Sequence, residues 1–182
     1  FLQANARLDS VIEQVASSRT EIIRVSAYAS IAMHWLPGII QRFREECPDV
    51  DVDIRMADHV DIPYEPLAQG KMDAILVSPQ DEGQYEWVHL ADDPMFAVLP
   101  KDFDTQGMTA FPLAAFEARD FIMPSQGFDK DIMRIFNRIG VKPHILPTWV
   151  DDPTVISMVS HGLGVSMMTE LTVRGRTDGV KL

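Results

Sequence analysis

Hydrophobic residues in the first half of the chain follow two alternating patterns. Three short segments have the β-branched or alternating character of strands, namely residues 22–27 (IIRVSA), 50–56 (VDVDIRM) and 72–78 (MDAILVS). Between them, residues 30–47 and 65–69 carry apolar side chains at helical spacing and end at Pro48 and Gly70. This β-α-β-α-β order predicts a parallel sheet with right-handed crossovers, in which the second strand lies near an edge and the third is buried.

The second half repeats this alternation after a polar loop. Strands are predicted at residues 95–100, 120–123, 144–150 and 164–168, with a further short one at 87–90. Helices are predicted near 113–116, from Ile132 to Ile139, and from Val155 to Val159. Gly140 and Gly162 end the last two helices, and Asp152 is the predicted N-cap of the final one, followed by Pro153. Two α/β halves of similar build predict two lobes with a cleft between them.

Residues 1–19 form a separate pattern at the start of the chain. Leu8, Val11, Ile12 and Val15 make one apolar stripe at helical spacing, and the segment has neither Gly nor Pro. A single stripe must be covered, either by the rest of the domain or by another helix. Both alternatives stay open at this point.

The topology places a binding site at the carboxyl ends of the strands, where open parallel sheets hold their ligands. In the first lobe these ends are Ala27–Ser30, Met56–Val60 and Ser78, and in the second they are Pro124–Phe128 and Trp149–Asp151. Ser30 stands where a strand turns into a helix, so its hydroxyl either caps that helix or, with the first N–H groups, binds an anion. Ser125, Gln126 and Gly127 occupy the equivalent turn of the second lobe. Two helix N-termini facing one cleft would suit a small carboxylate.

Composition narrows the class of protein. The chain has 182 residues, of which 46% are hydrophobic and 24% charged, which is typical of a folded globular protein. A net charge of -11 disfavours direct binding to phosphate backbones. The single cysteine, Cys47, excludes a disulfide within the chain and favours a reducing compartment. No apolar run approaches the roughly 18 residues of a membrane span, and Phe1 indicates a processed chain or a fragment.

The sequence contains none of the common motifs of catalytic or metal sites that we searched for. The five histidines are scattered, and none pairs with another ligand at a metal-binding spacing. No phosphate-binding glycine loop or nucleophile elbow is present; Gly162 and Gly164 are predicted to form a helix stop and a tight turn. The paired carboxylates and the ten methionines are interpreted as solvated loop acids and core residues. We therefore predict no catalytic residue, cofactor or metal.

A resemblance to a known family covers roughly residues 20–170. The segment IIRVSAYASIAMHWLPGIIQRFREECPDVDVDI resembles the start of the effector-binding domain of LysR-type regulators, with Leu36-Pro37, Phe43 and Pro48 at the family's positions. LAQGKMDAILVS, MFAVLP, FIMPSQG, FNRIGVKPHI and DDPTVISMVSHGLGVSMM continue the match in the same order. Each segment alone is degenerate, but the ordered set is specific.

The resemblance implies a mixed, mostly parallel α/β fold of two lobes, like type 2 periplasmic binding proteins. It implies a dimerising linker helix at residues 1–20, a first lobe at 21–90, a second lobe at 91–179, and the start of a return crossover at 180–182. The family's usual return to the first lobe is expected beyond this point. Tyr28 is bulky where the family often has a small or hydroxylated residue.

The resemblance and the topology together predict the sites. The predicted ligand-binding residues are Tyr28, Ala29, Ser30, His59, Val60, Ser78, Pro124, Ser125, Gln126, Gly127 and Trp149. The residues predicted to form a dimer interface are Leu36, Ile40, Phe43, Ile135 and Phe136.

The implied function is ligand sensing in a cytoplasmic bacterial regulator. A small organic acid or similar metabolite would bind between the lobes of a homodimer or homotetramer. DNA would be bound through a domain outside this chain, and no membrane would be involved. The alternatives are a solute-binding protein of a transport system, which requires a leader or lipid anchor, and an enzyme on the same scaffold, which requires a catalytic set that the sequence does not show.

Overall fold

The computed structural model describes residues 21–57, 64–78, 85–124, 128–148 and 150–182. The chain forms two compact units, 1–79 and 80–182, and each unit is described by itself. The division falls between Pro79 and Gln80, whereas the sequence places the lobe boundary after Leu90. The helix predicted at residues 1–20 lies outside the described residues.

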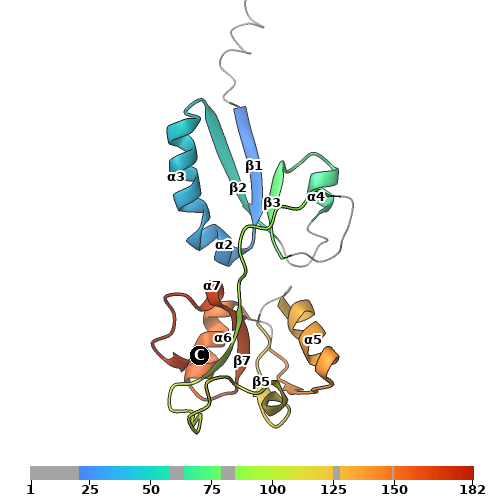
Figure 1. Ribbon diagram of the computed structural model, residues 1–182, viewed down its shortest axis with the longest axis vertical. Helices are drawn as coiled ribbons and strands as arrows, with labels where there is room; N and C mark the ends of the chain where they lie inside the picture. Colours follow the sequence, from blue (N-terminus) through green and yellow to red (C-terminus); the bar gives the residue numbers. More distant parts are fainter. Residues whose placement is uncertain (1–20, 58–63, 79–84, 125–127, 149) are drawn as a thin grey trace, which may run out of the picture. The chain divides into compact units, whose positions relative to one another are not determined.

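The first unit is built on a parallel sheet of three strands in the order β2-β1-β3 (Figure 1). These are β1 (Glu21–Ala27), β2 (Val50–Met56) and β3 (Ala74–Leu76). The register runs from Glu21 opposite Val50 to Ala27 opposite Met56, so the two longer strands end together. The parallel sheet predicted from the sequence, with residues 50–56 as an edge strand, is confirmed.

The third strand is shorter and less buried than predicted. It covers three residues instead of 72–78, and Ala74 is exposed while Ile75 and Leu76 are half-buried. Asp73 explains where the strand begins, because its carboxylate accepts the N–H of Arg24 at 2.8 Å and its own N–H donates to the Arg24 carbonyl at 2.9 Å. The side chain therefore takes the place of a backbone partner.

The helix predicted over residues 30–47 is two helices, α2 (Ala29–His34) and α3 (Leu36–Glu46). The sequence interpretation did not treat Pro37 as a helix break, although proline has no N–H and its ring collides with the carbonyl four residues earlier. Trp35 lies between the helices with φ −112°, and Pro37 falls in the first turn of α3, where proline is tolerated. Both helices pack on the sheet, with Val25, Ala27 and Leu36 at the centre of the core.

A one-turn helix, α4 (Glu65–Ala68), precedes β3 in the first unit. Gly70 follows it with φ 64°, the left-handed conformation that glycine adopts at low cost. The predicted helix stop at this glycine is confirmed.

The second unit has two small sheets, β7-β4-β8 and β5-β6, and its strands pair in both directions. Its strands are β4 (Met95–Pro100), β5 (Asp120–Phe121), β6 (His144–Ile145), β7 (Ser166–Thr169) and β8 (Val180–Lys181). Strand β4 lies antiparallel between β7 and β8, while β5 and β6 pair in parallel and a parallel bridge joins Phe121 to Val165. The sequence expectation that residues 180–182 begin a return to the first lobe stays a prediction; residues 180 and 181 pair with β4.

One strand predicted in the second unit is absent, and others were wrong in extent. Residues 87–90 are irregular and exposed. The strand predicted over 144–150 ends at Ile145, and β5 stops at Phe121 instead of residue 123. Pro147 cannot donate to a ladder, and the N–H of Thr148 turns back to the carbonyl of Leu146 at 2.8 Å.

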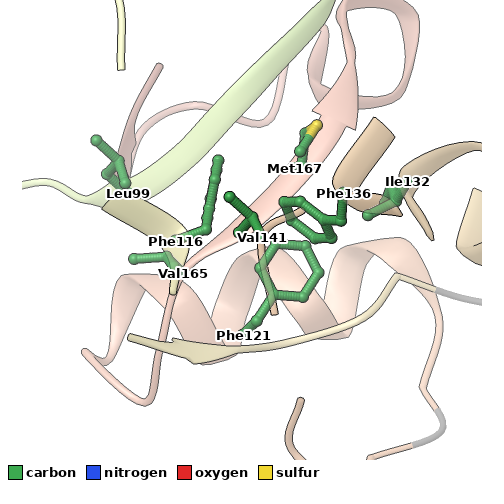
Figure 2. Packing of buried hydrophobic residues seen from close by; sticks show 8 residues of the cluster. All are labelled: Leu99, Phe116, Phe121, Ile132, Phe136, Val141, Val165 and Met167. Atoms are coloured by element: carbon green, nitrogen blue, oxygen red, sulfur yellow. The ribbon is translucent and has the colours of Figure 1, made fainter. Parts of the chain in front are cut away.

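Helices pack against the strands of the second unit in two hydrophobic clusters, one of them rich in phenylalanine. They are the 3-10 helix η1 (Leu113–Phe116), α5 (Phe128–Ile139), α6 (Asp152–Ser160) and α7 (Glu170–Val173). Figure 2 shows Phe121 of β5 and Phe136 of α5 packed together, and their ring centroids are 5.2 Å apart in an edge-to-face arrangement. Phe116 lies 5.5 Å from each of these rings. The three phenylalanines fix α5 and η1 against the strands.

The turn after α6 depends on two glycines for different reasons. Gly162 has φ 74° and ends the helix, as predicted. Gly164 permits a close approach, because a Cβ at this position would lie 2.6 Å from the carbonyl oxygen of Asp120. The same oxygen accepts the N–H of Val165 at 2.9 Å, so Gly164 lets the chain leading into β7 lie beside β5.

We expect Gly164→Ala to destabilise the second unit by about 1–3 kcal/mol, because the added methyl group must push the backbone of Asp120 away. The measurement is the free energy of unfolding in urea. Gly38→Ala is the matched control: nothing lies within 4 Å of its Cβ position, and alanine in place of glycine stabilises a helix by roughly 0.5–1 kcal/mol. Equal effects of the two substitutions would contradict the close approach at Gly164.

Candidate functional site

The carboxyl ends of the three parallel strands meet at the end of β1. The carbonyl of Ala27 accepts the N–H of Ala57 at 2.8 Å, and the N–H of Tyr28 donates to the carbonyl of Leu76 at 3.3 Å. Ala27 has no exposed surface. The segment that follows β1 is therefore held between the ends of both neighbouring strands, which is where the topology predicts a ligand site.

Helix α2 begins immediately at this point. Tyr28 is its N-cap residue, in extended conformation, and the first helical hydrogen bond runs from Ala32 N–H to the Tyr28 carbonyl at 2.9 Å. The N–H groups of Ala29, Ser30 and Ile31 come before that bond and have no carbonyl within the helix to bind. These three donors point out of the helix start, where the partial positive charge of the helix dipole also lies.

Ser30 does not cap α2, so the capping role that the sequence left open was wrong, and the anion-binding role stays a prediction. It is the second residue of the helix and is 8% exposed, and no side chain caps this helix. The cap position belongs to Tyr28, which is itself buried. The Ser30 hydroxyl is thus available beside the first-turn N–H groups.

The structure brings together part of the predicted ligand set. Tyr28, Ala29 and Ser30 are contiguous at the end of β1, and Ser78 is half-buried two residues beyond β3. Pro124, in the second unit, is buried and follows β5 by three residues. The other predicted residues lie outside the described part of the chain: His59, Val60, Ser125, Gln126, Gly127 and Trp149.

The start of α6 has a different chemistry from the start of α2. The N-cap is Asp151, whose carboxylate accepts the N–H of Thr154 at 3.0 Å, so the prediction of Asp152 as the cap was wrong by one residue. Proline at the second helical position is as compatible with this helix start as proline at the first, so the motif allowed both assignments. The hydrogen bond from Thr154 lowers the pKa of Asp151, and the charge of Arg176 acts in the same direction. This helix start is occupied by the chain's own carboxylate and is unsuited to an anion.

Among the residues that the structure describes, two side-chain polar atoms that the sequence analysis did not single out are buried without a hydrogen-bond partner. They are Nε2 of His34, in the last turn of α2, and Oγ1 of Thr148. Thr148 immediately precedes the predicted ligand residue Trp149. Most buried polar atoms in proteins are paired, so such atoms mark places to examine for ligand contacts. Burial of a single atom depends on tertiary packing, and the sequence carries no signal for it.

Four of the five residues predicted to form a dimer interface contact the cores of their own units. Leu36 is 3% exposed in the first core and Phe136 is fully buried in the second. Ile40 and Ile135 pack partly against the same cores, and Phe43 is half-buried. Their part in an interface stays a prediction.

The described residues give no support for a metal centre or a membrane span. Among them, no group of three His, Cys, Asp or Glu side chains is placed to hold a metal ion. Within the same residues, no helix is long and apolar enough to cross a bilayer.

Comparison with known proteins finds similar sequences over most of the chain. The family model described as LysR substrate binding domain matches residues 16–181. An uncharacterized HTH-type transcriptional regulator of Bacillus subtilis, YvbU, is 24% identical over 169 residues, which is 90% of this chain and 57% of the relative. The chain therefore spans little more than half the length of this curated relative.

Solved structures show the same fold. The regulatory domain of CcmR from Synechocystis, in complex with 2-PG, has a TM-score of 0.76 at 17% identity and covers 88% of this chain and 79% of that one. The effector binding domain of QuiR, in complex with shikimate, has a TM-score of 0.71 at 21% identity and covers 90% and 79%. The two-lobed α/β fold predicted from the sequence is confirmed.

We expect Asp151→Ala to lower the thermal midpoint, because the Asp151 carboxylate caps α6 by accepting the N–H of Thr154. The lowered pKa of Asp151 means that its ionised form stabilises the fold. That contribution is present above the carboxyl's ordinary pKa and is lost as the pH falls through the folded-state value.

The measurement is the thermal midpoint between pH 7 and pH 3. Asp151→Asn keeps a capping oxygen but cannot ionise, so its midpoint should fall less steeply with acid than that of the native chain. Equal acid sensitivity of the native chain and Asp151→Asn would contradict this role.

Proposed function

Because the chain belongs to the LysR substrate binding domain family, we propose that it is the effector-sensing part of a bacterial DNA-binding transcription regulator. The observation that carries the proposal is the family match over residues 16–181. The meeting of three strand ends at the start of α2 supports it, because that is where such a fold binds small molecules. The chain acts as a binding module and not as an enzyme.

The proposed effector is a small organic acid or a similar metabolite. In the first unit, the N–H groups of Ala29, Ser30 and Ile31 and the hydroxyl of Ser30 supply donors at one helix start. Shikimate, the ligand of the QuiR neighbour, is a small organic acid that carries one carboxylate. The start of α6 is closed to an anion by Asp151, so the acidic group is expected at α2 instead.

Regulation follows from differential affinity. An effector that binds one arrangement of the protein more tightly shifts the population toward it, and the same free energy changes the affinity for a second ligand such as DNA. The net charge of -11 disfavours DNA binding by this chain itself. The DNA contact is therefore assigned to another domain of the parent protein, a cytoplasmic homodimer or homotetramer without a cofactor.

The test of this function is to sequence the coding region upstream of Phe1. A basic helix-turn-helix domain in the same frame is the expected result. A leader peptide or lipid-attachment site would instead identify the solute-binding component of a transport system, and the regulator proposal would fail.

We expect Ser30→Ala to weaken effector binding about tenfold, the effect of losing one hydrogen bond to a charged group. The measurement is titration calorimetry with an organic acid that raises the thermal midpoint of the chain, starting from shikimate and 2-PG. Ser26→Ala is the matched control, because Ser26 is an equally buried serine within β1. If both variants lose affinity equally, or if neither loses affinity, Ser30 does not contact the effector.

A further inference from the structure

Thr148 buries a hydroxyl group that the fold of the second unit does not use. Its Oγ1 has no hydrogen-bond partner among the residues that the structure describes. A buried hydroxyl without a partner costs free energy, because it has lost its bonds to water and gained none in return. Valine has the same shape without the oxygen, so packing alone gives no reason for threonine at this position. Because most buried polar atoms are paired, this one indicates a partner from outside the chain.

Thr148 lies at the edge of the sheet where a ligand is expected. Strand β6 runs parallel to β5, and the N–H of Leu146 extends this pairing by donating to the carbonyl of Phe121 at 2.9 Å. Thr148 follows after Pro147, and Pro124 follows the end of β5 in the same way. Parallel strands end at one edge, so Thr148 and Pro124 both belong to the carboxyl edge, where α/β sheets bind their ligands.

The Thr148 side chain can present its hydroxyl to a ligand. The residue is half-buried although its Oγ1 is covered, so its exposed surface belongs to other atoms. Rotation about χ1 moves the oxygen from one staggered position to another. The hydroxyl gives up no hydrogen bond to the described residues when it turns toward a ligand.

The charge close to Thr148 in the chain indicates which group it would bind. Asp151 comes three residues later, and its exposed carboxylate caps α6 by accepting the N–H of Thr154 at 3.0 Å. This negative charge disfavours a second acidic group of a ligand at the same place. A hydroxyl group is uncharged, and it can both donate to and accept from the threonine oxygen.

We propose that Thr148 is an effector-binding residue of the second unit, and that its hydroxyl forms a hydrogen bond with a hydroxyl group of the effector. The effector is then a hydroxy acid, which carries its acidic group in one part and a neutral hydroxyl in another. This inference rests on the proposed effector-sensing function. It adds a residue that the ligand set predicted from the sequence does not contain, and it disfavours effectors with a second carboxylate near Asp151.

Replacing Thr148 by valine should have opposite effects on stability and on binding. The unliganded Thr148→Val chain should have a thermal midpoint about 2–4 °C higher, because the unpaired buried oxygen is gone. Thr172→Val is the matched control, since Thr172 is 2% exposed and its Oγ1 lies 3.0 Å from that of Thr169. That substitution breaks a buried hydrogen bond, so its midpoint should fall. A lower midpoint in Thr148→Val would mean that the hydroxyl has a partner within the protein, and the proposal would be wrong.

Titration calorimetry with two acids measures the effect on binding. Shikimate carries hydroxyl groups on its ring, and cyclohexenecarboxylate is the same acid without them. The native chain should bind shikimate more tightly. Thr148→Val should weaken shikimate binding about fivefold, the effect of losing one neutral hydrogen bond, and leave binding of the other acid unchanged. Thr172→Val should bind both acids as the native chain does.

Two results would overturn the role of Thr148 while leaving the sensing of an organic acid intact. One is equal affinity of the native chain for the two acids, and the other is native affinity of Thr148→Val for shikimate. If neither acid binds the native chain, the proposal fails together with the organic-acid effector on which it rests.

Discussion

The end of β1 is the constraint on which the first unit depends. This central strand must pair with β2 and β3 on its two sides and then turn directly into α2, with no loop between them. Both pairings continue at Ala27: its carbonyl accepts a hydrogen bond from the N–H of Ala57, beyond β2, and the N–H of Tyr28 donates to the carbonyl of Leu76 in β3. A fully buried alanine leaves room for both neighbours. The donors at the start of α2 are therefore fixed in place by the pairing of the sheet.

The same logic explains which parts of this site were predictable. The position of Tyr28, Ala29 and Ser30 beside the strand ends was predictable, because parallel strands in the pattern β-α-β end on the same side of a sheet and the sequence shows where each strand stops. Their binding of a ligand stays a prediction. The role of Ser30 was not predictable. Serine near a helix start caps it in one register and lies inside it in the next, and a shift of one residue decides between them.

Boundary errors elsewhere have equally local causes. Asp151 and Asp152 both precede Pro153, and only the backbone shows which carboxylate reaches the N–H of Thr154. Trp35 interrupts a segment whose apolar spacing continues smoothly, because Pro37 breaks the hydrogen-bond ladder without disturbing that spacing. Periodicity reports which side of an element is buried. It does not report where backbone hydrogen bonding fails, so strand and helix existence was predicted better than strand and helix ends.

The predicted interface residues show a deeper limit of pattern analysis. An amphipathic helix displays one apolar stripe, and the sequence cannot say whether its own sheet or another chain covers that stripe. In α3 and α5 the stripe is largely used within each unit, since Leu36 and Phe136 have almost no exposed surface. A side chain enclosed by its own core has few atoms left to contact a partner. The apolar spacing of α3 and α5 is thus explained by the core of each unit, and the interface inferred from the resemblance stays a prediction.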